Sequence, residues 1–123
     1  MANILIVDDE EMARAGFRKI LAREGYEIQE AQDGEEALRI LRRGNVDLCV
    51  LDIIMPNKDG IEVLRELRAE DNNLPVLAIS GGGHADLGLY LRMAKKLGVN
   101  ATLAKPFGAE ELLGVVESLL SKV

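Results

Sequence analysis

The chain has 123 residues and a formal net charge of −6 at pH 7, and hydrophobic residues make up 48% of it. This size predicts one domain, residues 1–123, and the acidic balance argues against general affinity for DNA or an anionic membrane. The single cysteine, Cys49, fits a reducing, cytoplasmic setting, and neither a signal peptide nor a membrane-spanning run of about 20 apolar residues is expected.

Short apolar runs alternate with segments whose apolar residues recur every three or four positions, so strands are predicted to alternate with helices. In chain order, we predict strand 3–7, helix 12–21, strand 26–31, a helix from the Asp33 cap to Gly44, a strand ending at Asp52, a helix opened by Asp59, strand 76–79, helix 87–97, strand 101–104 and helix 112–120. Asp33 and Asp59 are each followed three residues later by glutamate, the spacing of a capping box.

This alternation predicts an α/β fold, a doubly wound five-stranded parallel sheet with helices on both faces. The order expected for such a sheet is the flavodoxin-like 2-1-3-4-5. Parallel strands end at the same edge, and ligands bind in the crevice beyond that edge. The residues predicted to lie there are Asp8, Asp9, Asp52, Ser80 and Lys105.

In the order 2-1-3-4-5 the first and third strands are neighbours, which places Asp8 or Asp9 beside Asp52. Carboxylates that close repel each other unless a cation lies between them. Ligands that are all oxygen predict a hard cation, Mg²⁺ before Ca²⁺ or zinc. Together with the hydroxyl of Ser80 and the ammonium of Lys105, the set suits phosphoryl transfer to Asp52.

With these residues in this order, the chain resembles a known family, the receiver domain of two-component response regulators. The resemblance covers the whole chain. Each motif alone is weak, but their order and spacing together are specific. The motifs are ILIVDD at 4–9, DIIMP at 52–56, Gly60, Ser80 and KPF at 105–107.

The resemblance implies a role for each residue at the sheet edge. Asp52 accepts a phosphoryl group from the phosphohistidine of a sensor histidine kinase or a histidine phosphotransfer protein, with Mg²⁺ bound. Asp9 is expected to bind Mg²⁺ directly and Asp8 largely through water, while Asp52 and the carbonyl of Ile54 complete the ligands. Ser80 and Lys105 hold the phosphoryl oxygens, and the bond between Lys105 and Pro106 is expected to be cis.

The expected output is altered binding to a downstream protein that the sequence does not identify. The chain is therefore interpreted as a signalling protein that catalyses only its own phosphorylation and dephosphorylation. Neither direct DNA binding nor an effector domain is expected, because the acidic chain ends with the fifth predicted helix. A receiver excised from a longer protein would have the same sequence features.

Three positions depart from the family's pattern. Thr102 stands where the family usually carries an aromatic switch residue, and Ile54 stands where some members carry a polar side chain. Gly81–Gly83 replace a loop that usually carries side chains. Because glycine loses the most backbone freedom on ordering, we predict that residues 80–91 become ordered when Asp52 is modified.

Three other classes of protein are rival interpretations of this sequence. A flavodoxin-like cofactor protein needs phosphate-binding hydroxyls after the first strand, where this chain has two acids. A Mg²⁺-dependent phosphatase needs a second catalytic acid near Asp52 and a substrate cap, and the sequence shows neither. A pseudo-receiver that works as an adaptor does not need the complete acidic set that this chain carries.

Among the remaining residues, Phe17 and Ile20 are assigned to the core, beside the helix face that borders the kinase-docking surface in this family. His84 is assigned to a solvated or capping position.

Overall fold

The structure, a computed structural model, describes residues 2–53, 55, 59–81 and 87–121. Five strands alternate with five helices in this order: β1 (Asn3–Val7), α1 (Glu11–Ala22), β2 (Glu27–Ala31), α2 (Gly34–Arg42), β3 (Leu48–Asp52), α3 (Gly60–Ala69), β4 (Val76–Ser80), α4 (Leu87–Lys96), β5 (Ala101–Ala104) and α5 (Ala109–Ser121). Among these described helices, none is both long and apolar enough to cross a bilayer.

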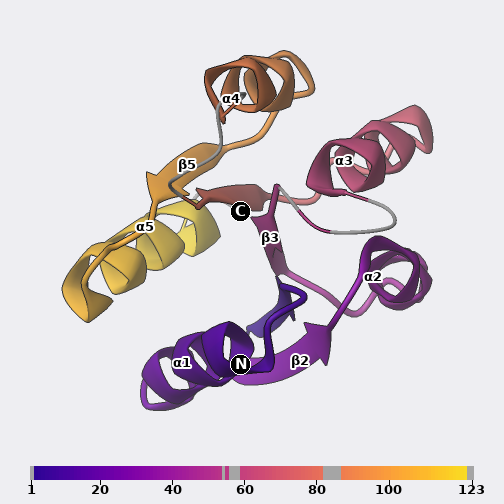
Figure 1. Cartoon of the computed structure of the whole chain (residues 1–123). Helices are drawn as coiled ribbons and strands as arrows, with labels where there is room; N and C mark the ends of the chain where they lie inside the picture. The colour runs from indigo at the N-terminus through magenta and orange to yellow at the C-terminus, as the bar shows by residue number, and fades with distance from the viewer. Residues whose placement is uncertain (1, 54, 56–58, 82–86, 122–123) are drawn as a thin grey trace.

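All strand pairs are parallel and the sheet order is β2-β1-β3-β4-β5, as predicted. The central strands β3 and β4 are buried along their whole length, which explains why their sequences are continuous apolar runs. The edge strand β2 is only partly buried and mixes polar with apolar residues. Figure 1 shows the twisted sheet between two layers of helices.

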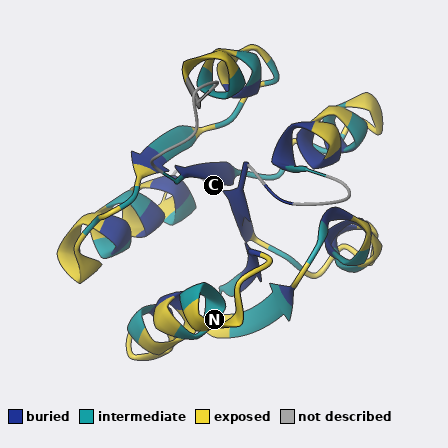
Figure 2. Ribbon diagram, viewed as in Figure 1, coloured by how far each residue is buried: buried dark blue, intermediate teal, exposed yellow. Residues whose placement is uncertain are grey.

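The helices form a separate core on each face of the sheet (Figures 1 and 2). Leu5 and Val7 of β1 belong to the cluster that α2, α3 and α4 cover. Their neighbours Ile4 and Ile6 belong to the cluster that α1 and α5 cover. Because successive side chains of a strand point to opposite faces, β1, β3 and β4 contribute to both cores.

Local signals in the sequence set the helix boundaries. The side chain of Asp33 accepts a hydrogen bond from the N–H of Glu36 at 2.8 Å, and that of Asp59 accepts one from Glu62 at 3.0 Å. Gly25, which follows the end of α1, has a φ of +88°, a conformation that glycine adopts without steric cost. The predicted caps and this helix stop are therefore confirmed.

Met12, the first residue of the predicted helix 12–21, does not pack in the core. Phe17 and Leu21 are buried, whereas Met12 is 87% exposed. Phe17 lies five positions after Met12, which turns the two side chains about 140° apart around a helix of 3.6 residues per turn. Met12 therefore lies outside the core, in the first turn of α1, close to the edge where the strands end.

Candidate functional site

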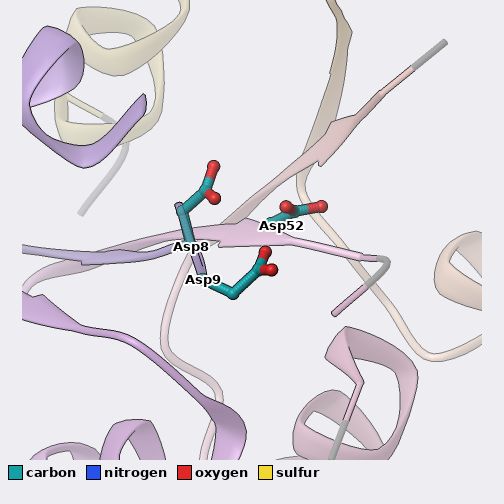
Figure 3. Close-up of side chains that lie close together, drawn as sticks. All are labelled: Asp8, Asp9 and Asp52. Atoms are coloured by element: carbon teal, nitrogen blue, oxygen red, sulfur yellow. The ribbon is translucent and has the colours of Figure 1, made fainter. Parts of the chain in front are cut away.

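Three carboxylates meet at the carboxyl edge of the sheet. Asp8 and Asp9 follow β1, Asp52 is the last residue of β3, and the pairing of Val7 with Leu51 brings the two strand ends together. One carboxylate oxygen from each lies within 4.8 Å of the others, and Figure 3 shows the three groups gathered around one point. The predicted convergence of these acids is thus present in the structure.

Asp8 is the most deeply buried of the three, with 1% of its surface exposed. Its Oδ1 accepts a hydrogen bond from the N–H of Glu10 at 2.9 Å, and its Oδ2 accepts one from Nζ of Lys105 at 3.2 Å. A buried carboxylate needs such donors because desolvation without partners is costly. Asp52 is also buried, at 7% exposure, whereas Asp9 is exposed.

Lys105 and Ser80 reach the same edge from the other side of the sheet. The N–H of Lys105 donates to the carbonyl of Ser80 at 2.8 Å, which joins the turn after β5 to the end of β4. Ser80 is 2% exposed and follows Ile79, the strand partner of Asp52. The peptide bond between Lys105 and Pro106 is cis, as the resemblance implied.

Gly60 supports the backbone beneath Asp52. Its N–H donates to the carbonyl of Ile53 at 2.8 Å. A Cβ at this glycine would lie 2.5 Å from the carbonyl oxygen of Asp52 and 2.6 Å from Cα of Ile53, closer than real Cβ atoms approach. Only glycine therefore allows the start of α3 to pack this tightly against the end of β3.

Several residues singled out in the sequence fall outside the described residues. They are Ile54, Gly82, Gly83 and His84, so the carbonyl ligand, the glycine switch and the histidine assignment stay predictions. Thr102 is described and half-buried in β5, paired with Ala78 on the face of the sheet that α4 covers.

Two residues near the acids were not singled out by the sequence patterns. Arg14 of α1 donates to the carbonyl oxygen of Asp8 at 2.6 Å and to the carboxylate of Glu30 at 3.3 Å. Glu30 lies on β2, next to the strand end. Arginine on an amphipathic helix is usually a solvated residue, and only the strand register, which pairs Ile6 with Glu30, could have pointed to this contact.

An apolar groove opens beside the acidic site, between α1 and the turn after β5. Phe17 and Phe107 line it, with ring centroids 5.5 Å apart. Its volume is about 340 Å³ and its other lining residues are Ala13, Gly16, Ile20, Lys105 and Pro106. Lys105 is thus shared between the groove and the acidic site.

Comparison with known proteins points to one family. Residues 4–117 match the family described as the response regulator receiver domain. The response regulators MprA of Mycobacterium sp. (strain KMS) and of Mycobacterium leprae (strain TN) are each 39% identical over 120 residues, 97% of this chain. The chain spans about half the length of these curated relatives, 50% and 51% respectively.

Solved structures agree with this match. A response regulator receiver domain protein from Clostridium thermocellum superposes with a TM-score of 0.89 at 28% identity, covering 99% of this chain and 96% of that one. The chemotaxis protein CheY4 of Vibrio cholerae gives 0.86 at 30% identity, covering 98% and 99%. NtrX of Brucella abortus gives 0.87 at 34% identity, covering 99% of this chain but 28% of NtrX.

Proposed function

The chain belongs to the response regulator receiver domain family, and from this premise we propose that Asp52 accepts a phosphoryl group from a phosphohistidine. The donor is a sensor histidine kinase or a histidine phosphotransfer protein. The observation that carries the proposal is the meeting of Asp8, Asp9 and Asp52 within 4.8 Å, beside the ammonium of Lys105.

The donor set fits Mg²⁺ as the bound cation. It consists of carboxylate oxygens with no histidine or second cysteine among them, which favours a hard ion. We assign Asp9 and Asp52 as direct ligands, Asp8 as a ligand largely through water, and the carbonyl of Ile54 as the remaining protein ligand. When bound, the ion neutralises charge on the acids and on the phosphoryl oxygens.

Each residue of the site has its own role in the transfer of the phosphoryl group. An oxygen of Asp52 attacks phosphorus, the N–P bond of the phosphohistidine breaks, and its electron pair stays on the imidazole nitrogen. The products are an aspartyl phosphate and a free histidine. Lys105, which contacts Asp8 at 3.2 Å in this structure, and Ser80 then donate hydrogen bonds to the phosphoryl oxygens.

The phosphohistidine donor has an apolar surface to dock on. The groove between α1 and the turn after β5 shares Lys105 with the acidic site, so a partner seated there brings its histidine close to Asp52. Met12, which is 87% exposed, extends the apolar surface toward the same edge. Burying such side chains favours association, and the gain is reduced by the entropy that the two partners lose on binding.

We take residues 1–123 as one receiver domain that signals by altered binding to a downstream protein and acts enzymatically on no other substrate. The net charge of −6 opposes direct DNA binding, and salt-sensitive binding to arbitrary duplex at physiological ionic strength would contradict this part. A cytoplasmic location belongs to the same proposal, because Cys49 is a free, buried thiol that fits a reducing compartment.

Intact-mass measurement after incubation with Mg²⁺ and acetyl phosphate tests the assignment of Asp52. The wild type is expected to gain about 80 Da, the mass of one phosphoryl group, and to lose this adduct when Mg²⁺ is chelated. Asp52→Asn removes the nucleophile and is expected to abolish the adduct. The matched control is Asp71→Asn, since Asp71 is an exposed aspartate with a φ of +59°, which asparagine tolerates. An undiminished adduct in Asp52→Asn would sink the assignment.

A further inference from the structure

Arg14 links the metal-binding end of β1 to the neighbouring strand. Its Nη1 donates to the carbonyl oxygen of Asp8 at 2.6 Å, and its Nε donates to Oε1 of Glu30 at 3.3 Å. The side chain of Arg14 is 13% exposed, so most of the guanidinium is removed from water. Glu30 faces α1 because it pairs with Ile6, whose side chain lies in the core that α1 covers.

This contact acts on the peptide between the two acids. The N–H of Asp8 is held by the carbonyl of Ala31 at 3.2 Å, and Arg14 holds the carbonyl on the other side of the same residue. That carbonyl belongs to the peptide bond that leads into Asp9, so its orientation sets the direction in which the Asp9 side chain leaves the backbone. Within the described part of the chain, no hydrogen bond holds the Asp9 carboxylate itself, and its position therefore depends on this backbone.

Glu30 offsets part of the positive charge beside the acids. Its carboxylate pairs with Arg14 at 3.3 Å and with Arg18 at 2.6 Å, so one negative charge is shared between two guanidiniums. Within the described part of the chain, Arg14 donates to the backbone of Asp8 and not to the carboxylates of Asp8 or Asp9. A group that orients metal ligands in this way typically changes metal affinity by about 10- to 100-fold.

We infer that Arg14 is a positioning residue for the divalent cation: by fixing the peptide between Asp8 and Asp9, it orients the two carboxylates and raises the affinity for Mg²⁺. The inference rests on the proposed function, because it takes these acids as ligands. Arg18 shares the helix and the partner of Arg14 but is 51% exposed and bonds to Glu30 alone among the described residues. Loss of Arg18 therefore removes an ion pair without touching the acids.

A Mg²⁺ titration of the full chain, followed by amide chemical shifts, separates the two arginines. Arg14→Met is expected to raise the dissociation constant for Mg²⁺ by about tenfold, whereas Arg18→Met keeps it within about twofold of the wild type. Arg14→Lys keeps the charge, but its donors sit on a single nitrogen in place of the two that Arg14 uses. Its dissociation constant is therefore expected to lie between the two. Should Arg14→Met fail to fold, Arg14→Lys compared with Arg18→Lys decides the question in the same way.

A second readout tests positioning against general damage. In the acetyl phosphate reaction, Arg14→Met is expected to need about tenfold more Mg²⁺ for half the maximal rate while reaching the wild-type rate at saturating Mg²⁺. Equal Mg²⁺ affinities for Arg14→Met and Arg18→Met, with a wild type that binds Mg²⁺, would overturn this inference and leave the proposed function standing. A wild type that binds no Mg²⁺ would overturn the proposed function, and the inference with it.

Discussion

The two edges of the sheet hold charged side chains in different surroundings. At the carboxyl edge, three carboxylates lie within 4.8 Å of one another. At the amino edge, the guanidinium of Arg68 in α3 donates to the backbone carbonyls of Leu97 and Gly98 after α4, at 3.1 and 2.9 Å. It also donates to those of Asn72 and Leu74, at 2.8 and 3.1 Å.

This comparison distinguishes a charge that stabilises the fold from charges that we propose act in function. The donors of Arg68 are met by carbonyls of this chain, so its contacts stabilise the fold without any other molecule. Burial lowers the pKa of this guanidinium, and the nearby thiol of Cys49 raises it. The acids at the other edge repel one another, and a bound cation would stabilise this arrangement beyond what the donors to Asp8 supply.

Replacing Arg68 is expected to have the largest effect on the free energy of unfolding. Arg68→Met keeps an unbranched apolar side chain but leaves four backbone carbonyls without their donor. Because hydrogen bonds to charged groups contribute about 1.5–3 kcal/mol and not every carbonyl stays dry, we expect the free energy of unfolding to fall by about 3 kcal/mol. Urea denaturation measures this change.

The control for this prediction is Arg65→Met, on an exposed position of the same helix. Its free energy of unfolding is expected to stay within about 0.5 kcal/mol of the wild type. The Mg²⁺ affinity of folded Arg68→Met is expected to match the wild type, because the acids lie at the other edge. Equal stability of the two variants would mean that Arg68 is not the structural charge described above.

The sequence predicted the positions of the three acids better than those of the two arginines, for a physical reason. Asp8, Asp9 and Asp52 each follow an apolar run, and parallel strands must end at one edge, so the order of elements alone brings them together. Arg14 and Arg68 lie on amphipathic helices, where a charged residue predicts only a solvent-facing position. Their carbonyl partners come from other segments of the chain, and no spacing in the sequence encodes such contacts.

Replacing Gly60, where the backbone packs closely against Asp52, is expected to have the next largest effect on stability. Gly60→Ala places a Cβ 2.5 Å from the carbonyl oxygen of Asp52, so β3 or α3 must shift. Overpacking of this kind costs about 2 kcal/mol, and displacement of Asp52 is expected to slow phosphorylation as well. Thermal unfolding and the acetyl phosphate reaction measure the two effects.

Gly114 in α5 provides the matched substitution. A Cβ there meets nothing within 4 Å, so Gly114→Ala is expected to stabilise the protein by up to about 1 kcal/mol, the helix propensity of alanine over glycine. The phosphorylation rate of this variant should equal that of the wild type. If both alanine variants gained stability, the packing beneath Asp52 would have to be looser than the structure has it.

Removing one of the clustered acids is expected to raise stability while removing function. Asp9→Asn relieves repulsion with Asp8 and Asp52, so in Mg²⁺-free buffer the free energy of unfolding should rise by about 1 kcal/mol. Added Mg²⁺ should raise the melting temperature of the wild type but not that of Asp9→Asn, since ligand binding stabilises only the state that binds it. A variant that is less stable than the wild type without Mg²⁺ would show that the acids do not strain the fold.

The smallest expected effect comes from an exposed arginine, Arg42 of α2, whose guanidinium bonds to Glu70 at 2.6 Å. The hydrogen bond from Arg42 lowers the pKa of the Glu70 carboxyl below its ordinary value of 4.5. A depressed pKa in the folded state means that the pair contributes stability above about pH 4.5 and loses it as the pH falls through the folded-state pKa. Glu70→Gln should therefore melt slightly below the wild type at pH 7 and together with it in strong acid, and high salt should narrow the gap at pH 7. A gap at pH 7 as large as that of Arg68→Met would contradict the comparison, because Arg42 and Glu70 are 48% and 40% exposed and water screens their attraction.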